Sequence, residues 1–234
     1  MQTLIGAAAL ISTIFGLVQG TKRGIPLFFR IVTYGFACYA MGTLYDILRT
    51  ALVSSGALPA LALKQLSAAD PGAVMPLVTG QAGFSIGLIG YAGAFFFLFS
   101  SYVGALDTLA DGREPKLRPY RLGALAAPVL IVLEGALLLP GARDAMAPMA
   151  LALIPVAGTS YFAAKHLVLP DIEMGIIRVM RPYNACVLAI CILQPVVLLA
   201  AAGGIMHAAA CLTTAAAVLV ALPLARIGVA KWFR

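Results

Sequence analysis

Seven apolar runs, each long enough for a membrane-spanning helix, constrain the fold of this chain more than any other feature. They cover approximately residues 3–20, 26–50, 82–106, 122–141, 145–165, 182–203 and 206–226. A bilayer core about 30 Å thick is crossed by roughly 20 residues of α-helix. None of the runs alternates between apolar and polar residues, as a half-buried strand does. The sequence therefore predicts an all-α polytopic membrane protein, with residues 1–234 forming one transmembrane domain of seven helices.

The composition excludes a water-soluble domain. Hydrophobic residues make up 62% of the chain and charged residues 11%, and the mean hydropathy is +1.00. A soluble domain has about a quarter of its residues charged. The four cysteines all lie inside apolar runs without a Cys-x-x-Cys spacing, which predicts buried thiols and no metal site or disulfide framework. These residues are Cys38, Cys186, Cys191 and Cys211.

The basic residues predict the orientation in the membrane. The side that receives the C-terminus carries thirteen Lys and Arg residues: Lys22, Arg23, Arg30, Arg113, Lys116, Arg118, Arg121, Lys165, Arg178, Arg181, Arg226, Lys231 and Arg234. The other side carries three: Arg49, Lys64 and Arg143. Because basic residues accumulate in cytoplasmic loops, we expect the N-terminus outside and the C-terminus in the cytoplasm of a prokaryotic plasma membrane. Basic loops that meet anionic lipid explain the net charge of +7 without a nucleic-acid partner.

A weak internal similarity predicts a repeat. Aligning Arg30 with Arg178 places Ala37-Cys38 on Ala185-Cys186 without a gap, and LIGAAA of the first helix aligns with LIPVAG of the fifth after one residue of slip. Helices one to three and five to seven would then be parallel copies joined by the fourth helix, a 3+1+3 plan. The alternative is a chance match between short segments of biased composition.

This topology resembles that of the sugar-transporting SWEETs, the PnuC-type vitamin transporters and the KDEL receptors. The Pro-Gln signature of those proteins is missing, since Gln194-Pro195 has the reverse order. Microbial rhodopsins have a similar topology, but the seventh helix contains no lysine in HAAACLTTAAAVLVALPLA that could carry retinal. The resemblance therefore concerns topology alone.

One carboxylate, Glu134, interrupts the fourth apolar run. With Arg121 and Arg143 as the ends of this helix, its midpoint lies near residue 132 and Glu134 within about 3 Å of the bilayer centre. Such a group costs about 2.5–3.5 kcal/mol on insertion scales, so we expect it to face the bundle interior or water. It would be either a proton-coupling or ligand-binding group, or a permanently protonated acid that bonds a neighbouring helix.

Polar residues on other helices lie at a similar depth and predict a midplane binding site. Pro155 and Pro195 interrupt two of these helices, as in many transporter sites. Taken singly, each polar residue is more often a packing contact. The predicted substrate-binding residues are Glu134, Gln194, Tyr39, Tyr91, Thr213, Thr214 and Asn184.

Charged residues near the two ends of the helices suggest local pairing. Asp46 and Arg49 are three residues apart on one helical face, which predicts either a structural ion pair or an entrance gate. At the other end, Asp107 closes the third helix opposite Arg178 and Arg181, where we expect interface capping.

The sequence indicates no catalytic machinery and no cofactor. His166 and His207 are expected at opposite faces of the membrane, where they cannot share a metal ion, and no hydrolase or phosphate-loop motif occurs. We expect a small-solute transporter or channel, proton-coupled through Glu134, with an unidentified small-molecule ligand. The alternatives are a seven-helix receptor or sensor that signals through a partner at its basic cytoplasmic loops, and a structural subunit of a membrane complex. Partners compatible with the sequence are the lipid bilayer, a second copy of the chain, and a protein at the cytoplasmic face.

Overall fold

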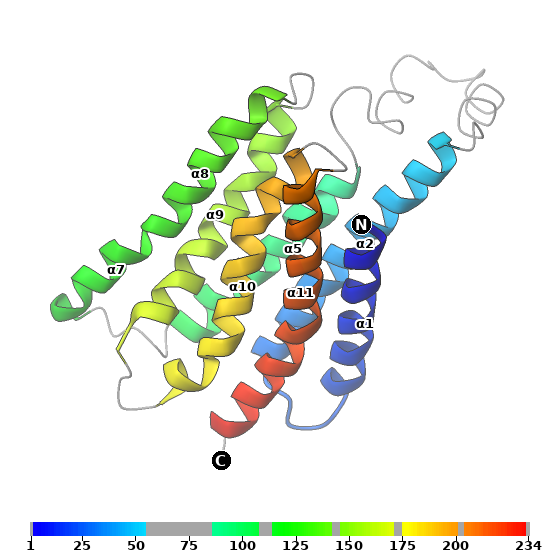
Figure 1. The fold of residues 1–234 in the computed structure, drawn as a ribbon. Coiled ribbons are helices and arrows are strands. Elements are labelled where there is room, and N and C mark those ends of the chain that lie inside the picture. The colour runs from blue at the N-terminus through cyan, green and yellow to red at the C-terminus, as the bar shows by residue number, and fades with distance from the viewer. Residues whose placement is uncertain are drawn as a thin grey trace, which may run out of the picture.

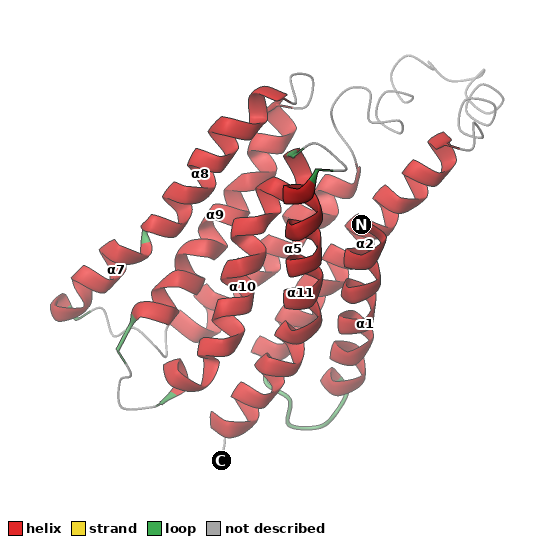
Figure 2. Cartoon of the chain, in the orientation of Figure 1, coloured by secondary structure: helices red, strands yellow, loops and turns green. Residues whose placement is uncertain are grey.

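The computed structural model describes residues 2–54, 86–107, 114–141, 146–170, 175–200 and 204–232. These residues form helices and short connections, with no strand among them (Figure 2). Seven of the helical segments are long and apolar enough to cross a membrane. The predicted all-α class with seven such helices is therefore confirmed for the described part of the chain, and these are the features of an integral membrane protein.

The helices follow one another as long rods connected by short turns (Figure 1). A π-helical turn (η1) prolongs α5, and short 3₁₀ turns (η2 and η3) flank the α7–α8 segment. The bounds are α1 Gln2–Gly20, α2 Leu27–Ser54, α5 Ile86–Ser101, η1 Tyr102–Leu106, η2 Pro115–Leu117, α7 Arg118–Ala124, α8 Ala126–Leu138, η3 Leu139–Gly141, α9 Met146–Val168, α10 Ile176–Leu199 and α11 Ile205–Trp232.

The fourth helical segment begins earlier than the predicted apolar range 122–141. Pro115 starts η2, consistent with the preference of proline for the first turn of a helix, and the segment long and apolar enough to cross a membrane extends over Pro115–Leu138. Its first residues include Lys116 and Arg118. The location of the bilayer centre along this segment, and with it the depth of Glu134, stays a prediction.

Six of the spans pack in a closed ring. In the order α1, α2, α5, α9, α10, α11, each helix contacts the next, and α11 contacts α1 to close the ring. The α7–α8 segment lies outside this ring, where α8 packs against α9 and α10 (Figure 1). The interior of the ring is therefore formed by the first three and the last three spans.

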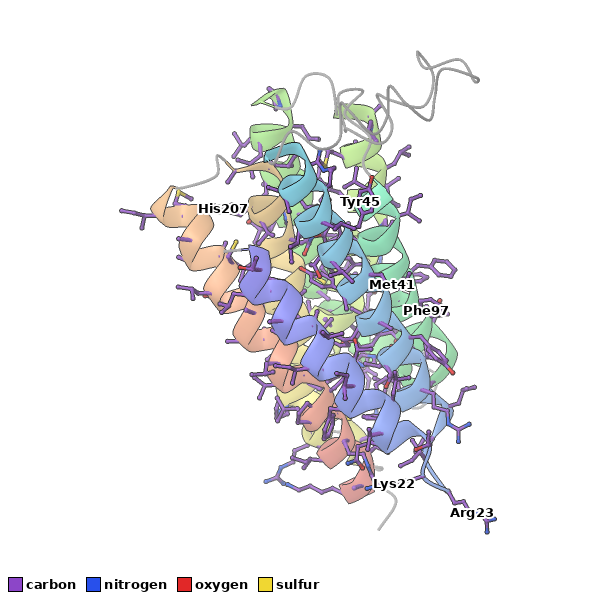
Figure 3. The ribbon with its side chains drawn as sticks, turned by 90° about the vertical axis from the view of Figure 1, so that its right-hand side faces the viewer. Lys22, Arg23, Met41, Tyr45, Phe97 and His207 are labelled. Atoms are coloured by element: carbon purple, nitrogen blue, oxygen red, sulfur yellow. The ribbon has the colours of Figure 1, made fainter. Side chains whose placement is uncertain are left out.

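The two termini lie at opposite ends of the bundle (Figure 1), as an odd number of spans requires. Lys22 and Arg23 project from the turn between α1 and α2 (Figure 3), at the end where α11 terminates. We call this end the basic end. Four residues of the predicted charge count lie outside the described residues: Lys64, Arg113, Arg143 and Arg234. The cytoplasmic location of the basic end stays a prediction.

Two hydroxyl–carbonyl hydrogen bonds join the first three spans to the last three. Ser12 of α1 donates to the backbone carbonyl of Val218 in α11 over 2.7 Å, and both groups are buried. The hydroxyl of Thr159 in α9 lies 3.0 Å from the carbonyl oxygen of Phe95 in α5 and 2.8 Å from that of Pro155 in its own helix, so its one proton is shared between these two acceptors. The two halves of the ring meet where α1 contacts α11 and where α5 contacts α9, and we call these two contacts the seams. Each seam is thus bridged by a hydrogen bond.

Candidate functional site

A buried hydrogen bond between Tyr39 and Gln194 links α2 to α10. The Tyr39 hydroxyl donates to Oε1 of Gln194 over 2.7 Å, and both side chains are almost inaccessible. The ring of Tyr91, on α5, lies edge-on to that of Tyr39 with 5.2 Å between centroids. The Tyr91 hydroxyl donates to Oδ2 of Asp46 on α2 over 3.0 Å. These four residues, Asp46, Tyr91, Tyr39 and Gln194, form a continuous group that we call the Gln194 cluster.

The local sequence explains how α2 supplies two members of this cluster. Tyr39 and Asp46 are seven residues apart, so both lie on the helical face that meets α5. Gly42 lies between them on that face and lets the α5 backbone approach. A Cβ atom added at Gly87 of α5 would lie 2.5 Å from Oδ1 of Asp46, so the carboxylate rests directly on the α5 backbone.

The interior of the bundle contains donors with no partner. Nε2 of Gln194 and Oγ1 of Thr214 are both buried and make no hydrogen bond within the described chain. Leaving a buried polar group unpaired costs about 1–3 kcal/mol, so these groups favour a bound molecule with an acceptor oxygen, water included. Because an amide nitrogen can only donate, the chemistry of the site selects acceptors.

A second tyrosine–amide pair lies further along α10. The Tyr102 hydroxyl donates to Oδ1 of Asn184 over 2.8 Å, and Nδ2 of Asn184 is buried without a partner. Asn184 and Gln194 are ten residues apart, or about 15 Å along the helix axis. Tyr102 was not predicted as a site residue, because the π-helical turn that aims it inward has no sequence signature.

The basic end holds a buried ion-pair group on α9 and the end of α5. Asp107 forms ion pairs with Nζ of Lys165 and, over 3.3 Å, with Nε2 of His166. Desolvation raises the pKa of the Asp107 carboxyl, but the hydrogen bonds and charges of His166 and Lys165 outweigh it and hold the pKa below its ordinary value. The ammonium of Lys165 also lies 5.3 Å from the ring centre of Phe162.

This group gives Asp107 partners that were not predicted. Asp107 forms ion pairs with Lys165 and His166, whereas the expected capping with Arg178 and Arg181 stays a prediction. Arg181 donates from Nη2 to the backbone carbonyl of Leu169 over 3.2 Å. The α5–α9 contact that brings these residues together links positions about 60 residues apart in the chain, which spacing rules cannot reveal.

Besides Asn184, two further predicted binding residues lie away from the Gln194 cluster. Glu134 is on α8, outside the ring, where Oε2 is buried and has no hydrogen-bond partner. No hydrogen bond joins Glu134 to Gln194 or to Tyr39 in the described chain. Thr213 is exposed on the outer face of α11, whereas the adjacent Thr214 is completely buried. The structure thus gathers Tyr39, Tyr91 and Gln194, and leaves Glu134 and Thr213 apart.

Asp46 of the predicted pair with Arg49 also contacts Tyr91 on α5. Asp46 accepts the hydroxyl of Tyr91, a contact that the three-residue spacing did not suggest. Arg49 is half-buried one turn further along α2. An ion pair or gate formed by Asp46 and Arg49 stays a prediction.

The two histidines are set in different surroundings. His207 of α11 is buried at the end opposite the basic end (Figure 3), with its ring nitrogens 3.7 and 3.8 Å from the sulfur of Cys211 one turn later. His166 belongs to the Asp107 group. Across the residues that the structure describes, no three His, Cys, Asp or Glu side chains are placed to bind a metal ion.

Comparison with known protein families, with curated proteins and with solved structures finds no match to this chain.

Proposed function

We propose that the chain transports a small solute through the interior of the six-helix ring, without catalysing a reaction. The observation that carries the proposal is the pair of buried carboxamides on α10, Gln194 and Asn184. Each is fixed through its oxygen by a tyrosine hydroxyl, and each leaves its NH₂ group unpartnered. Buried donors fixed in orientation are suited to a solute with acceptor oxygens, and two such sites at different depths favour passage over permanent binding.

The seams between the two halves of the ring support a transporter built from a parallel repeat. The register that aligns Arg30 with Arg178 also aligns Asp46 with Gln194, and both of these accept a tyrosine hydroxyl. The seam bonds are related in the same way, because each runs from the first helix of one triplet to the third helix of the other.

For the first helix of each triplet, α1 and α9, the register given by the seam bonds differs slightly from the predicted alignment. The seam bonds pair Ser12 with Thr159, an offset of 147 residues, whereas aligning LIGAAA with LIPVAG gives 149. Transport in this scheme is a rocking of α1–α2–α5 against α9–α10–α11, during which the two seam bonds break and re-form.

Proton coupling through Glu134 is a separate part of the proposal. Its support is a carboxylate inside a membrane span with a buried, unpartnered oxygen. Because α8 contacts α9 and α10, protonation there would act on the second half of the ring and not on the Gln194 cluster directly.

The test is uptake by the purified chain in liposomes, with and without an imposed pH gradient. The probes are radiolabelled small solutes grouped by their acceptor chemistry: neutral sugars, amides and carboxylates. We expect saturable uptake of one group and its loss in Gln194→Leu, with uptake retained in Thr213→Val, a control on the exposed face of α11. Saturable binding without uptake would refute transport and favour a receptor. Glu134→Gln that leaves uptake unchanged at every pH would refute the coupling alone.

A further inference from the structure

A polar crevice opens between α1 and α2 at the basic end. It has a volume of about 320 Å³, and its walls include Gly16, Gly20, Arg30, Thr33 and Tyr34. Gly20 leaves the space open, because a Cβ added there would meet only Cγ of Arg30, at 4.0 Å. At Gly16 the same atom would fall 2.6 Å from the Thr33 side chain, so here the two helices are already in contact and close the crevice.

The crevice lies beside three basic residues that form no ion pair within the described part of the chain. Arg30 is exposed at its wall, and Lys22 and Arg23 are exposed in the turn that leads into α2 (Figure 3). The ion pairs at the same end of the bundle join Asp107 to Lys165 and His166, and Glu114 to Lys116. Among the described residues, the positive charge of the crevice is therefore not offset by an ion pair.

The depth of the crevice matches the headgroup region of a bilayer. Lys22 and Arg23 lie outside the candidate spans Thr3–Gly20 and Leu27–Ala51, and Arg30 lies one turn inside the second of them. Tyr34 follows one turn deeper and is 51% exposed, as expected of an aromatic side chain at the membrane interface.

The donors available in the crevice define the ligand. The hydroxyl of Thr33 donates to the carbonyl of Phe29 over 2.8 Å, and that of Thr21 donates to the carbonyl of Val18 over 3.0 Å, so neither has a proton left for an anion. Arg30 and Tyr34 are the remaining side-chain donors of the wall. A guanidinium presents two parallel N–H groups that match phosphate oxygens, and a phenol can donate a third hydrogen bond.

We propose that this crevice binds the phosphate group of an anionic lipid in the leaflet at the basic end. Arg30 binds the phosphate, Lys22 and Arg23 add attraction from the rim, and the acyl chains lie along exposed apolar side chains such as Leu17. The site is separate from the interior of the ring and does not depend on the proposed transport. Free inorganic phosphate offers the same chemistry, and the experiment distinguishes the two sources.

The test titrates the purified full chain in detergent with phosphatidylglycerol, with phosphatidylcholine and with inorganic phosphate, and measures lipid occupancy by native mass spectrometry. We expect preferential binding of phosphatidylglycerol, which inorganic phosphate does not displace. Arg30→Gln should weaken this binding about fivefold, the effect of one interfacial charge. Gly20→Leu fills the crevice without changing the charge and should weaken it to a similar extent.

Arg178→Gln is the matched control, because Arg178 is an exposed arginine at the same end of α10. We expect it to keep the affinity of the unmodified chain. Equal losses in Arg30→Gln and Arg178→Gln, with no loss in Gly20→Leu, would show diffuse attraction to the basic end and overturn the proposal. Displacement by inorganic phosphate would overturn the lipid assignment. Equal occupancy by phosphatidylcholine, in which a choline cation balances the same phosphate, would overturn the preference for an anionic lipid. If Arg30→Gln does not fold, Gly20→Leu decides the question.

Discussion

Replacing Gly90 with alanine tests the backbone-to-backbone contact between α2 and α5. A Cβ atom at Gly90 of α5 would lie 2.6 Å from Cα of Gly42, 2.7 Å from its nitrogen and 2.8 Å from the carbonyl oxygen of Cys38. Ordinary contacts of a Cβ atom are 3.4–4 Å, so α2 and α5 must move apart by about 1 Å. The obstructing atoms belong to the backbone and cannot rotate away.

The expected magnitude follows from two opposing effects. Overpacking of this kind costs about 1–3 kcal/mol. Alanine in place of glycine inside a helix gains roughly 1 kcal/mol of helix propensity, which conceals part of that cost. Gly123→Ala supplies the reference, because nothing lies within 4 Å of a Cβ added at Gly123 of α7. The difference in unfolding free energy between the two variants should therefore equal the cost of the overlap, about 1–3 kcal/mol.

The assay is reversible unfolding of both variants in mixed micelles, followed by circular dichroism or by tryptophan fluorescence of Trp232. We expect Gly123→Ala to be as stable as the unmodified chain or slightly more stable, and Gly90→Ala to be the less stable of the two. Separation of α2 from α5 should also weaken the bond between Tyr91 and Asp46. Equal stability of the two variants would refute backbone contact between α2 and α5 at this position.

Three further predictions concern single interactions. Tyr39→Phe should lower the unfolding free energy by about 0.6–1.7 kcal/mol. The double variant with Gln194→Leu should lose less unfolding free energy than the sum of the losses in the two single variants. Strictly additive losses in this double-mutant cycle would contradict the hydrogen bond. Ser12→Ala and Thr159→Ala should each lower the unfolding free energy by about 0.6 kcal/mol. A loss in only one of these variants would argue against equivalent roles of the two seams. The pKa of Asp107 is lowered in the folded chain, so its contribution is present above the ordinary value of about 3.9 and is lost as the pH falls further. Acid titration of stability should therefore be less steep in Asp107→Asn between about pH 4 and pH 2, and an unchanged slope would contradict the ion pairs.

Much of the architecture could be predicted because it depends on length and composition alone. Inside a bilayer the backbone must satisfy its own hydrogen bonds, so an apolar run of sufficient length has to be a helix wherever its neighbours lie. The seven spans follow from this requirement, and the candidate binding residues were found by the same reasoning about depth. The fourth helical segment is longer at its N-terminal end than the predicted apolar run, since Lys116 and Arg118, which precede that run, already belong to the segment.

Which face of each helix is buried was decided by the tertiary structure. Thr213 and Thr214 are neighbours in sequence, yet one is exposed and the other is completely buried. A soluble helix reveals its buried face through hydrophobic periodicity, but lipid is as apolar as the protein interior, so that signal is absent here. The same reason explains why Tyr91 with Asp46, and Asp107 with Lys165 and His166, were found only after the helices were packed. Depth in the membrane is a property of position along the chain, whereas the partner of a polar group depends on which helices meet at that depth.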